Sequence, residues 1–156
     1  MENIAMLVGE KLLTKSWFLA TAESCTGGMV SMLITDVAGS SQWFERGFVT
    51  YSNQSKQQML GVSEKTLNCF GAVSHETVQE MVVGAIKNSN AHCGISISGI
   101  AGPDGGSEDK PVGTVFIGWK IPDSEAESEK LLFQGSRQEV REQAAQYSLE
   151  KLFKLI

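Results

Sequence analysis

Residues 17–28 read WFLATAESCTGG, and their pattern is the clearest sign of architecture in the sequence. The apolar run over residues 17–22 predicts a buried strand, and Gly27 and Gly28 predict a tight turn. A helix-like segment follows over about residues 29–35. The stretch therefore predicts a strand that passes through a turn directly into a helix, as in α/β proteins.

Helical spacing of apolar residues recurs along the rest of the chain. It predicts an opening helix over about residues 4–12 and a short helix over residues 53–60. A further helix follows Ser74, which is placed to cap it. The last helix begins at Ser136, where the S-x-x-E pattern is that of a capping box.

Strand-like segments lie between these helices. Residues 48–51, 94–98 and 112–119 are predicted to be strands. The acidic run over residues 123–129 predicts a solvated turn, and residues 130–133 predict a strand that pairs antiparallel across it.

The chain has 156 residues, which predicts a single domain over residues 1–156. Helices and strands interleave along it, and the acidic turn adds an antiparallel pair. We therefore predict an α/β fold, a three-layer α/β/α sandwich with a mixed, mostly parallel sheet.

The charge balance disfavours nucleic acid and membranes as partners. Lys and Arg number 13 and Asp and Glu number 18, so the net charge is −5 and no positive field attracts a polyanion. No stretch approaches the ~20 apolar residues of a membrane helix, and the first residues lack the pattern of a signal peptide. We therefore expect a cytoplasmic protein.

The cysteines and acidic residues predict no metal site. Cys25, Cys69 and Cys93 are odd in number and lack CxxC spacing, which disfavours both a disulfide framework and structural zinc. The acidic residues of the segment 104–109 lack the spacing of an EF-hand.

Ser24 is the candidate nucleophile. It lies on the predicted strand-to-helix turn, which presents a side chain at the carboxyl edge of the sheet, where α/β proteins form their ligand sites. Backbone amides near Thr26, Gly27 and Gly28, and the positive end of the following helix, would stabilise an oxyanion. The alternative is structural: Ser24 or Thr26 caps a helix and the glycines only make the turn.

Lys56 is the candidate base. On the predicted helix it shares a face with Met59 and Leu60, the face that the helix should bury. Burial lowers the pKa of a lysine and would fit Lys56 to deprotonate a serine. The alternative is a lysine whose stem packs while its ammonium reaches water. Tyr51 precedes this helix, as a polar partner or as half-buried core.

Arg137 and Arg141 lie at the start of the last predicted helix, where the macrodipole disfavours cations. A bound phosphate would explain their placement, and so would ion pairs with Glu139 and Glu142.

Cys25 is a rival nucleophile, because it adjoins the serine and His75 or His92 would serve as its base. A lone cysteine beside small residues is more often buried and inert.

Five motifs follow one another along the chain and together resemble the CinA C-terminal domain family. They are TAESCTGG at 21–28, YSN at 51–53 with Lys56 and LGV at 60–62, GAVS at 71–74, SGIAGP at 98–103 and KPVGT at 110–114. The resemblance extends from about Ala20 to the last helix, and several motifs in one order are far more specific than a glycine pattern.

The resemblance implies a nicotinamide-nucleotide amidohydrolase that converts nicotinamide mononucleotide to nicotinic acid mononucleotide and ammonia in pyridine-nucleotide salvage. It implies a Ser-Lys dyad without metal or cofactor, a three-layer α/β/α fold and a homo-oligomer. Ser24 matches the nucleophile, Lys56 its base and Tyr51 a tyrosine beside the dyad.

Substrate-binding positions are also implied by the resemblance. Arg137 matches an arginine that contacts substrate, and it would hold the 5′-phosphate together with Arg141. Thr26 and Ser41 match further site positions, and Gly27 and Gly28 complete the predicted substrate-binding set. A non-catalytic nucleotide sensor with the same pocket is the competing hypothesis.

Overall fold

A computed structural model describes residues 2–156 and shows a mixed sheet. Its strands are β1 (Leu19–Glu23), β2 (Phe44–Val49), β3 (Cys93–Gly99), β4 (Thr114–Lys120) and β5 (Glu127–Leu132), in the spatial order β2-β1-β3-β4-β5. β1 pairs parallel with both β2 and β3, whereas β4 pairs antiparallel with β3 and β5. Among the strands of residues 2–156, β4 alone therefore runs against the others.

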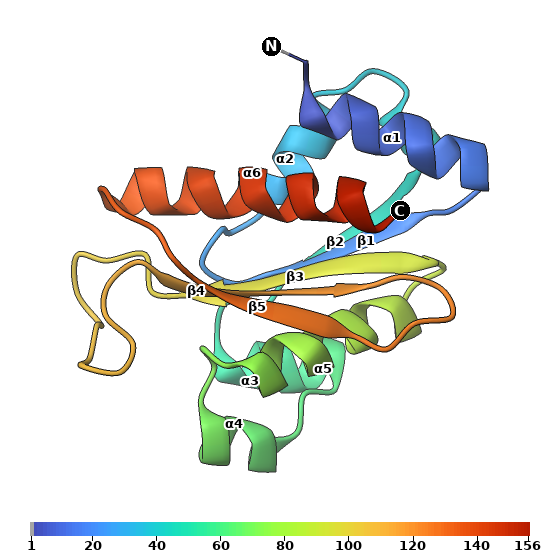
Figure 1. The fold of residues 1–156 in the computed structure, drawn as a ribbon. Coiled ribbons are helices and arrows are strands. Elements are labelled where there is room, and N and C mark those ends of the chain that lie inside the picture. The colour runs from blue at the N-terminus through green and yellow to red at the C-terminus, as the bar shows by residue number, and fades with distance from the viewer. Residues whose placement is uncertain (1) are drawn as a thin grey trace.

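Helices cover both faces of this sheet (Figure 1). On one face lie α1 (Ile4–Lys15), α2 (Met29–Thr35) and α6 (Arg137–Leu155), and on the other lie α3 (Asn53–Leu60), α4 (Glu64–Phe70) and α5 (His75–Lys87). A 3₁₀ turn, η1 (Ser40–Gln42), precedes β2. The arrangement confirms the three-layer α/β/α sandwich with a mixed sheet.

The helix caps form where the sequence predicts them. The Ser136 hydroxyl accepts a hydrogen bond from the Glu139 amide, and the Glu139 carboxylate accepts one from the Ser136 amide, which completes the capping box of α6. At α3 and α5 the serine hydroxyl alone forms the cap: Ser52 accepts from the Ser55 amide and Ser74 from the Thr77 amide. Gly61 ends α3 in the left-handed conformation that glycine adopts without strain.

Helix α4 and the start of strand β2 differ from the sequence prediction. Helix α4 was not predicted, because over its seven residues Leu67 alone is buried and no apolar period is visible. Strand β2 begins at Phe44, four residues earlier than predicted, because an edge strand with partly exposed residues lacks a strong pattern.

The acidic run is only partly a turn. Its last residues lie in β5, where Glu129 accepts a hydrogen bond from Tyr147 and pairs with Lys151 at 2.9 Å. These contacts join β5 to α6 and hold that helix over the sheet.

The buried side chains of α3 and α5 position the helix that carries Lys56. Leu60, Val78 and Met81 are buried between these helices and the sheet. At Gly84 on α5, an added Cβ would overlap the carbonyl oxygen of Leu60, so only glycine permits this approach. The close packing determines where α3 lies against the carboxyl ends of the strands.

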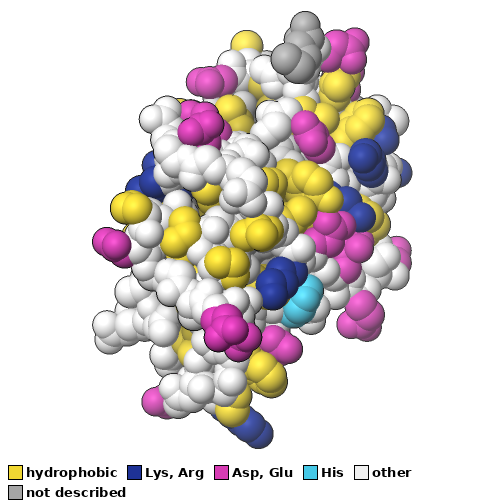
Figure 2. Space-filling view, turned by 60° about the vertical axis from the view of Figure 1, so that its left-hand side comes forward, with side chains coloured by type: hydrophobic (Ala, Val, Ile, Leu, Met, Phe, Trp, Pro, Cys, Tyr) yellow, Lys and Arg dark blue, Asp and Glu magenta, His cyan; other side chains and the backbone are white. Residues whose placement is uncertain are grey.

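The charged side chains on the surface are of both signs, in agreement with the charge balance of the sequence. Figure 2 shows acidic and basic side chains interspersed with hydrophobic ones on one face of the molecule. None of the helices in residues 2–156 is both long and apolar enough to span a bilayer.

Candidate active site

The carboxyl ends of the parallel strands meet at one edge of the sheet. Ser24 follows β1, while Thr50 and Tyr51 follow β2. In the strand register Glu23 lies opposite Val49 and Ile97, so the residues just beyond these positions are neighbours. This is the edge at which α/β sheets form their ligand sites.

Lys56 reaches this edge from α3 and contacts Ser24 directly. Its Nζ lies 3.0 Å from Ser24 Oγ, and it donates to the carbonyl oxygens of Thr50 at 2.7 Å and Tyr51 at 3.2 Å. The Lys56 side chain is buried, with 1% of its surface exposed, and Ser24 is 7% exposed. The alternative of a lysine that extends to water is therefore wrong.

Burial makes the neutral form of Lys56 easier to reach than that of an exposed lysine. Burial lowers the pKa of Lys56 from 10.5 to about 8. A neutral amine has two N–H donors and one lone pair, and the two carbonyls accept the two N–H groups. In the ammonium form Lys56 Nζ donates to Ser24 Oγ at 3.0 Å, and in the neutral form its lone pair is left to accept from that hydroxyl, which is the geometry of a base beside a nucleophile.

Cys25 lacks the features of a reactive thiol. It is buried, and burial raises the pKa of its thiol to about 12. The histidines are engaged elsewhere: His75 Nδ1 bonds to Ser128 at 2.8 Å, and His92 Nδ1 accepts the Phe18 amide at 2.9 Å. The structure therefore disfavours the cysteine nucleophile. Within residues 2–156 no three His, Cys, Asp or Glu side chains gather in a way that could hold a metal ion.

We call residues 24–28 the nucleophile turn. The buried carboxylate of Glu23 fixes this turn through hydrogen bonds. The Glu23 side chain is 1% exposed and accepts hydrogen bonds from Thr26 Oγ1, the Val30 amide and both the amide and hydroxyl of Ser31 at 2.7–3.1 Å. The first free amides of α2 thus bind an internal carboxylate. The prediction that this helix end would face an oxyanion is wrong, because Glu23 occupies it.

Two amides of the nucleophile turn are used within the fold. Ser24 N–H donates to Ile97 O at 2.9 Å, and Gly27 N–H donates to Ser24 O at 3.1 Å. Gly27 is therefore not a free donor. In the described chain the amides of Cys25 and Thr26 donate to no protein group, and Cys25, the residue after the nucleophile, lines the cavity beside it.

A cavity of about 310 Å³ opens beside Ser24 and Lys56. Residues 98–102, with Asp104 and Gly105, form one wall, and Tyr51 and Arg137 contribute at its border. The cavity is large enough for a small molecule that bears polar groups.

Arg137 links this border to the neighbouring loop. Its Nη1 donates to Gly102 O at 2.7 Å, and its Nη2 lies 3.4 Å from Tyr51 Oη. Both side chains are exposed, Tyr51 by 64%. The remaining N–H groups of the guanidinium are thus near enough to solvent to meet an anionic ligand.

Arg141 faces the nucleophile turn instead of the cavity. Its Nε donates to Cys25 O at 2.9 Å and its Nη2 to Thr26 O at 3.2 Å. It does not line the cavity, so the prediction that it shares a phosphate with Arg137 is wrong. Within residues 2–156 neither arginine forms an ion pair, which also removes the salt-bridge explanation.

The other predicted binding positions do not line the cavity. The Thr26 hydroxyl is buried on Glu23, and Gly27 and Gly28 supply the positive φ angles, +58° and +106°, that the turn needs. Ser41 lies on η1, before β2, whereas the dyad lies beyond the end of β2. The structure therefore leaves Ser41 at the opposite edge of the sheet.

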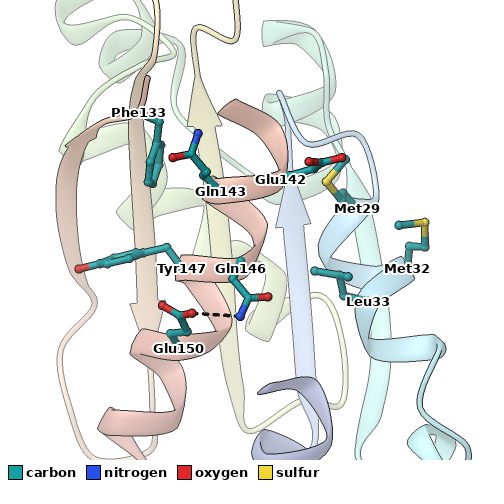
Figure 3. Close-up of a pocket in the computed structure, with 9 residues that line it drawn as sticks. All are labelled: Met29, Met32, Leu33, Phe133, Glu142, Gln143, Gln146, Tyr147 and Glu150. Carbon is teal, nitrogen blue, oxygen red and sulfur yellow. Dashed lines mark hydrogen bonds between the residues drawn. The ribbon is translucent and has the colours of Figure 1, made fainter. Parts of the chain in front are cut away.

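A second, larger hollow of about 620 Å³ lies between α2 and α6 (Figure 3). Its lining is mostly apolar and includes Met29, Met32, Leu33, Phe133 and Tyr147. None of the candidate catalytic residues lines it, whereas Ser24 and Lys56 line the smaller cavity.

The sequence did not predict the roles of the Thr50 and Tyr51 carbonyls, of Glu23 or of Arg141. The carbonyls of Thr50 and Tyr51 are main-chain groups and leave no sequence signal. Glu23 did leave one, because a carboxylate at the end of a buried apolar strand needs partners. Arg141 was recognised as misplaced for the helix dipole, but its partners are carbonyls and not an anion.

Comparisons with known proteins agree on one family. The model of the CinA C-terminal domain matches residues 1–156. A protein of Escherichia coli strain K12 named nicotinamide-nucleotide amidohydrolase PncC is 54% identical over 146 residues, which cover 94% of this chain and 88% of that protein. A protein of the same name from Enterobacter agglomerans is 50% identical over 150 residues, 96% of this chain and 92% of the relative. The crystal structure of a CinA superfamily protein from Enterobacter cloacae superimposes with a TM-score of 0.93 at 37% identity, covering 99% of this chain and 93% of that one.

Proposed function

The chain belongs to the CinA C-terminal domain family, and on that premise we propose that it hydrolyses nicotinamide mononucleotide to nicotinic acid mononucleotide and ammonia. The observation that carries the proposal is the buried contact of 3.0 Å between Lys56 Nζ and Ser24 Oγ beside a cavity. The relatives named nicotinamide-nucleotide amidohydrolase support the choice of substrate.

Acylation is the first half of the proposed reaction. Neutral Lys56 takes the proton of Ser24 while Oγ bonds to the carboxamide carbon, and the carbonyl oxygen becomes an oxyanion. The free amide of Cys25 stabilises that oxyanion. As the C–N bond breaks, the protonated Lys56 gives its proton to the leaving nitrogen, which departs as ammonia.

Deacylation repeats the same steps with water. Lys56 takes a proton from the water molecule, whose oxygen bonds to the acyl carbon. The bond from that carbon to Ser24 Oγ breaks, and Lys56 returns the proton to the serine. The product leaves as a carboxylic acid, which releases its proton to solvent and becomes the carboxylate, and the dyad is restored.

We place the proposed salvage role in the cytoplasm, and the free state of the cysteines agrees with that location. Cys25, Cys69 and Cys93 are free in the described chain, as a reducing compartment permits. Self-association remains a prediction from the family resemblance.

The test is ammonia release from nicotinamide mononucleotide by the purified protein in EDTA, with free nicotinamide as a parallel substrate. We expect release from the nucleotide, and much slower release from nicotinamide, because the latter lacks the phosphate that Arg137 would hold. Binding of the nucleotide without ammonia release would overturn the proposal in favour of the nucleotide sensor. Activity that EDTA abolishes would contradict a metal-free dyad.

Replacing Arg137 with alanine should raise KM for nicotinamide mononucleotide about 10- to 100-fold, the usual worth of a hydrogen bond to a charged group. The expected change in kcat is small, because Arg137 lies at the border of the cavity and not beside Ser24. Steady-state kinetics measure KM for the mononucleotide in both proteins. Nicotinamide riboside, which lacks the phosphate, is the comparison substrate. An unchanged KM for the mononucleotide would exclude the phosphate role.

A further inference from the structure

Arg141 holds the main chain of the nucleophile turn although it touches neither the cavity nor the dyad. Its two hydrogen bonds go to carbonyl oxygens that lie 116 and 115 residues away in sequence. An arginine donates from a planar fork, so two bonds from one guanidinium fix both acceptors in direction as well as distance.

These bonds determine where two consecutive amides point, those of Thr26 and Gly27. The Cys25 and Thr26 carbonyls belong to the peptide units on either side of Thr26, and each trans peptide carries its N–H opposite its C=O. The Thr26 amide therefore points away from Arg141. The Gly27 amide is likewise held in direction, and it donates to Ser24 O at 3.1 Å.

The hydrogen bond from the Gly27 amide to Ser24 O also fixes the direction of the Cys25 amide. Because Ser24 O accepts from Gly27, the N–H of the Ser24–Cys25 peptide points to the other side. That N–H belongs to Cys25, which lines the cavity and donates to no group in the described protein.

We propose that Arg141 is a positioning residue that orients the Cys25 amide toward the acyl oxygen of the substrate. The inference rests on the proposed function and extends it to a residue outside the cavity. Glu23 holds the turn from below through Thr26 Oγ1 and the start of α2, and Arg141 holds it from α6. The oxyanion site is then preorganised between a carboxylate and a guanidinium.

The test compares Arg141→Ala and Arg141→Lys with the wild-type protein. We expect kcat for nicotinamide mononucleotide to fall about 10²- to 10³-fold in Arg141→Ala, as when an oxyanion donor is lost, while KM changes by less than about threefold. Arg141→Lys should recover little, because an ammonium cannot donate as a fork. Free guanidinium ion should partly restore Arg141→Ala. Arg46→Ala, which removes an exposed arginine paired with Glu45, is the matched control and should leave kcat unchanged.

A second substrate separates this inference from the proposed function. Acylation of Ser24 by p-nitrophenyl acetate needs the dyad and the oxyanion amide but no nucleotide contacts, so it should slow in Arg141→Ala by a similar factor. A wild-type protein that reacts with the ester but not with the mononucleotide would overturn only the proposed substrate. Equal acylation rates in wild type and Arg141→Ala, with both folded by circular dichroism, would overturn the role of Arg141. A wild-type protein that reacts with neither compound would overturn both proposals.

Discussion

The Ser24→Ala variant should lose its ammonia-releasing activity toward nicotinamide mononucleotide almost completely, with kcat falling about 10⁴- to 10⁶-fold. In the proposed mechanism the substitution removes the protein atom that bonds to the carboxamide carbon. It also leaves the buried turn intact, because Ser24 Oγ makes no hydrogen bond on which the turn depends: its partners are Lys56 Nζ and, at 3.4 Å, Tyr51 O. Affinity for the nucleotide should therefore persist, and calorimetric titration measures it.

Cys25→Ala is the control for this prediction. The Cys25 thiol is buried and its raised pKa keeps it neutral, so removing it should reduce kcat by less than about tenfold through packing alone. The Cys25 amide remains in place as an oxyanion donor. Loss of activity in Cys25→Ala with activity retained in Ser24→Ala would reverse the assignment of the nucleophile.

Substitution of Lys56 has the second largest expected effect. Both Lys56→Met and Lys56→Arg should lower kcat about 10²- to 10⁴-fold, the usual contribution of a general base. Methionine lacks a basic nitrogen, and arginine keeps a charge and donors for the Thr50 and Tyr51 carbonyls but does not deprotonate. Retention of full activity in Lys56→Arg would show that the lysine serves only as a donor or a charge.

The pH dependence of kcat/KM reports the same group in the free enzyme. Because burial lowers the pKa of Lys56 to about 8, its amine is neutral in about a tenth of the molecules at pH 7, against about 3 in 10 000 for an unperturbed lysine. The rate should therefore rise tenfold per pH unit below 8 and become constant above it. A profile that continues to rise to pH 10 would contradict the proposed neutral lysine.

Fold and site were predictable to different degrees. The amphipathic pattern of α5 and the capping box of α6 were visible because they repeat within one element. Helix α4 and the start of β2 were not, because short or edge elements bury few side chains and leave no period.

The identity of Ser24 and Lys56 was available from residue types and motifs, but their contact was not. It depends on the register of β1 against β2 and on the approach of α5 to α3 at Gly84, both of which are tertiary. Ser41 was predicted from the resemblance alone, and it does not line the cavity. A position carried over from family resemblance need not lie at the site within a single chain, and here η1 lies at the far edge of the sheet.

The hydrogen bonds from α6 to the nucleophile turn also have a consequence for the newly made protein. Ser24 and Lys56 leave the ribosome well before Arg141, because synthesis of the 85 residues from Lys56 to Arg141 takes roughly 4–17 s at 5–20 residues per second. During that interval the serine and lysine exist without the helix that holds the turn. The emerging chain should therefore be unable to hydrolyse cellular amides, and catalysis begins only when α6 packs onto the sheet.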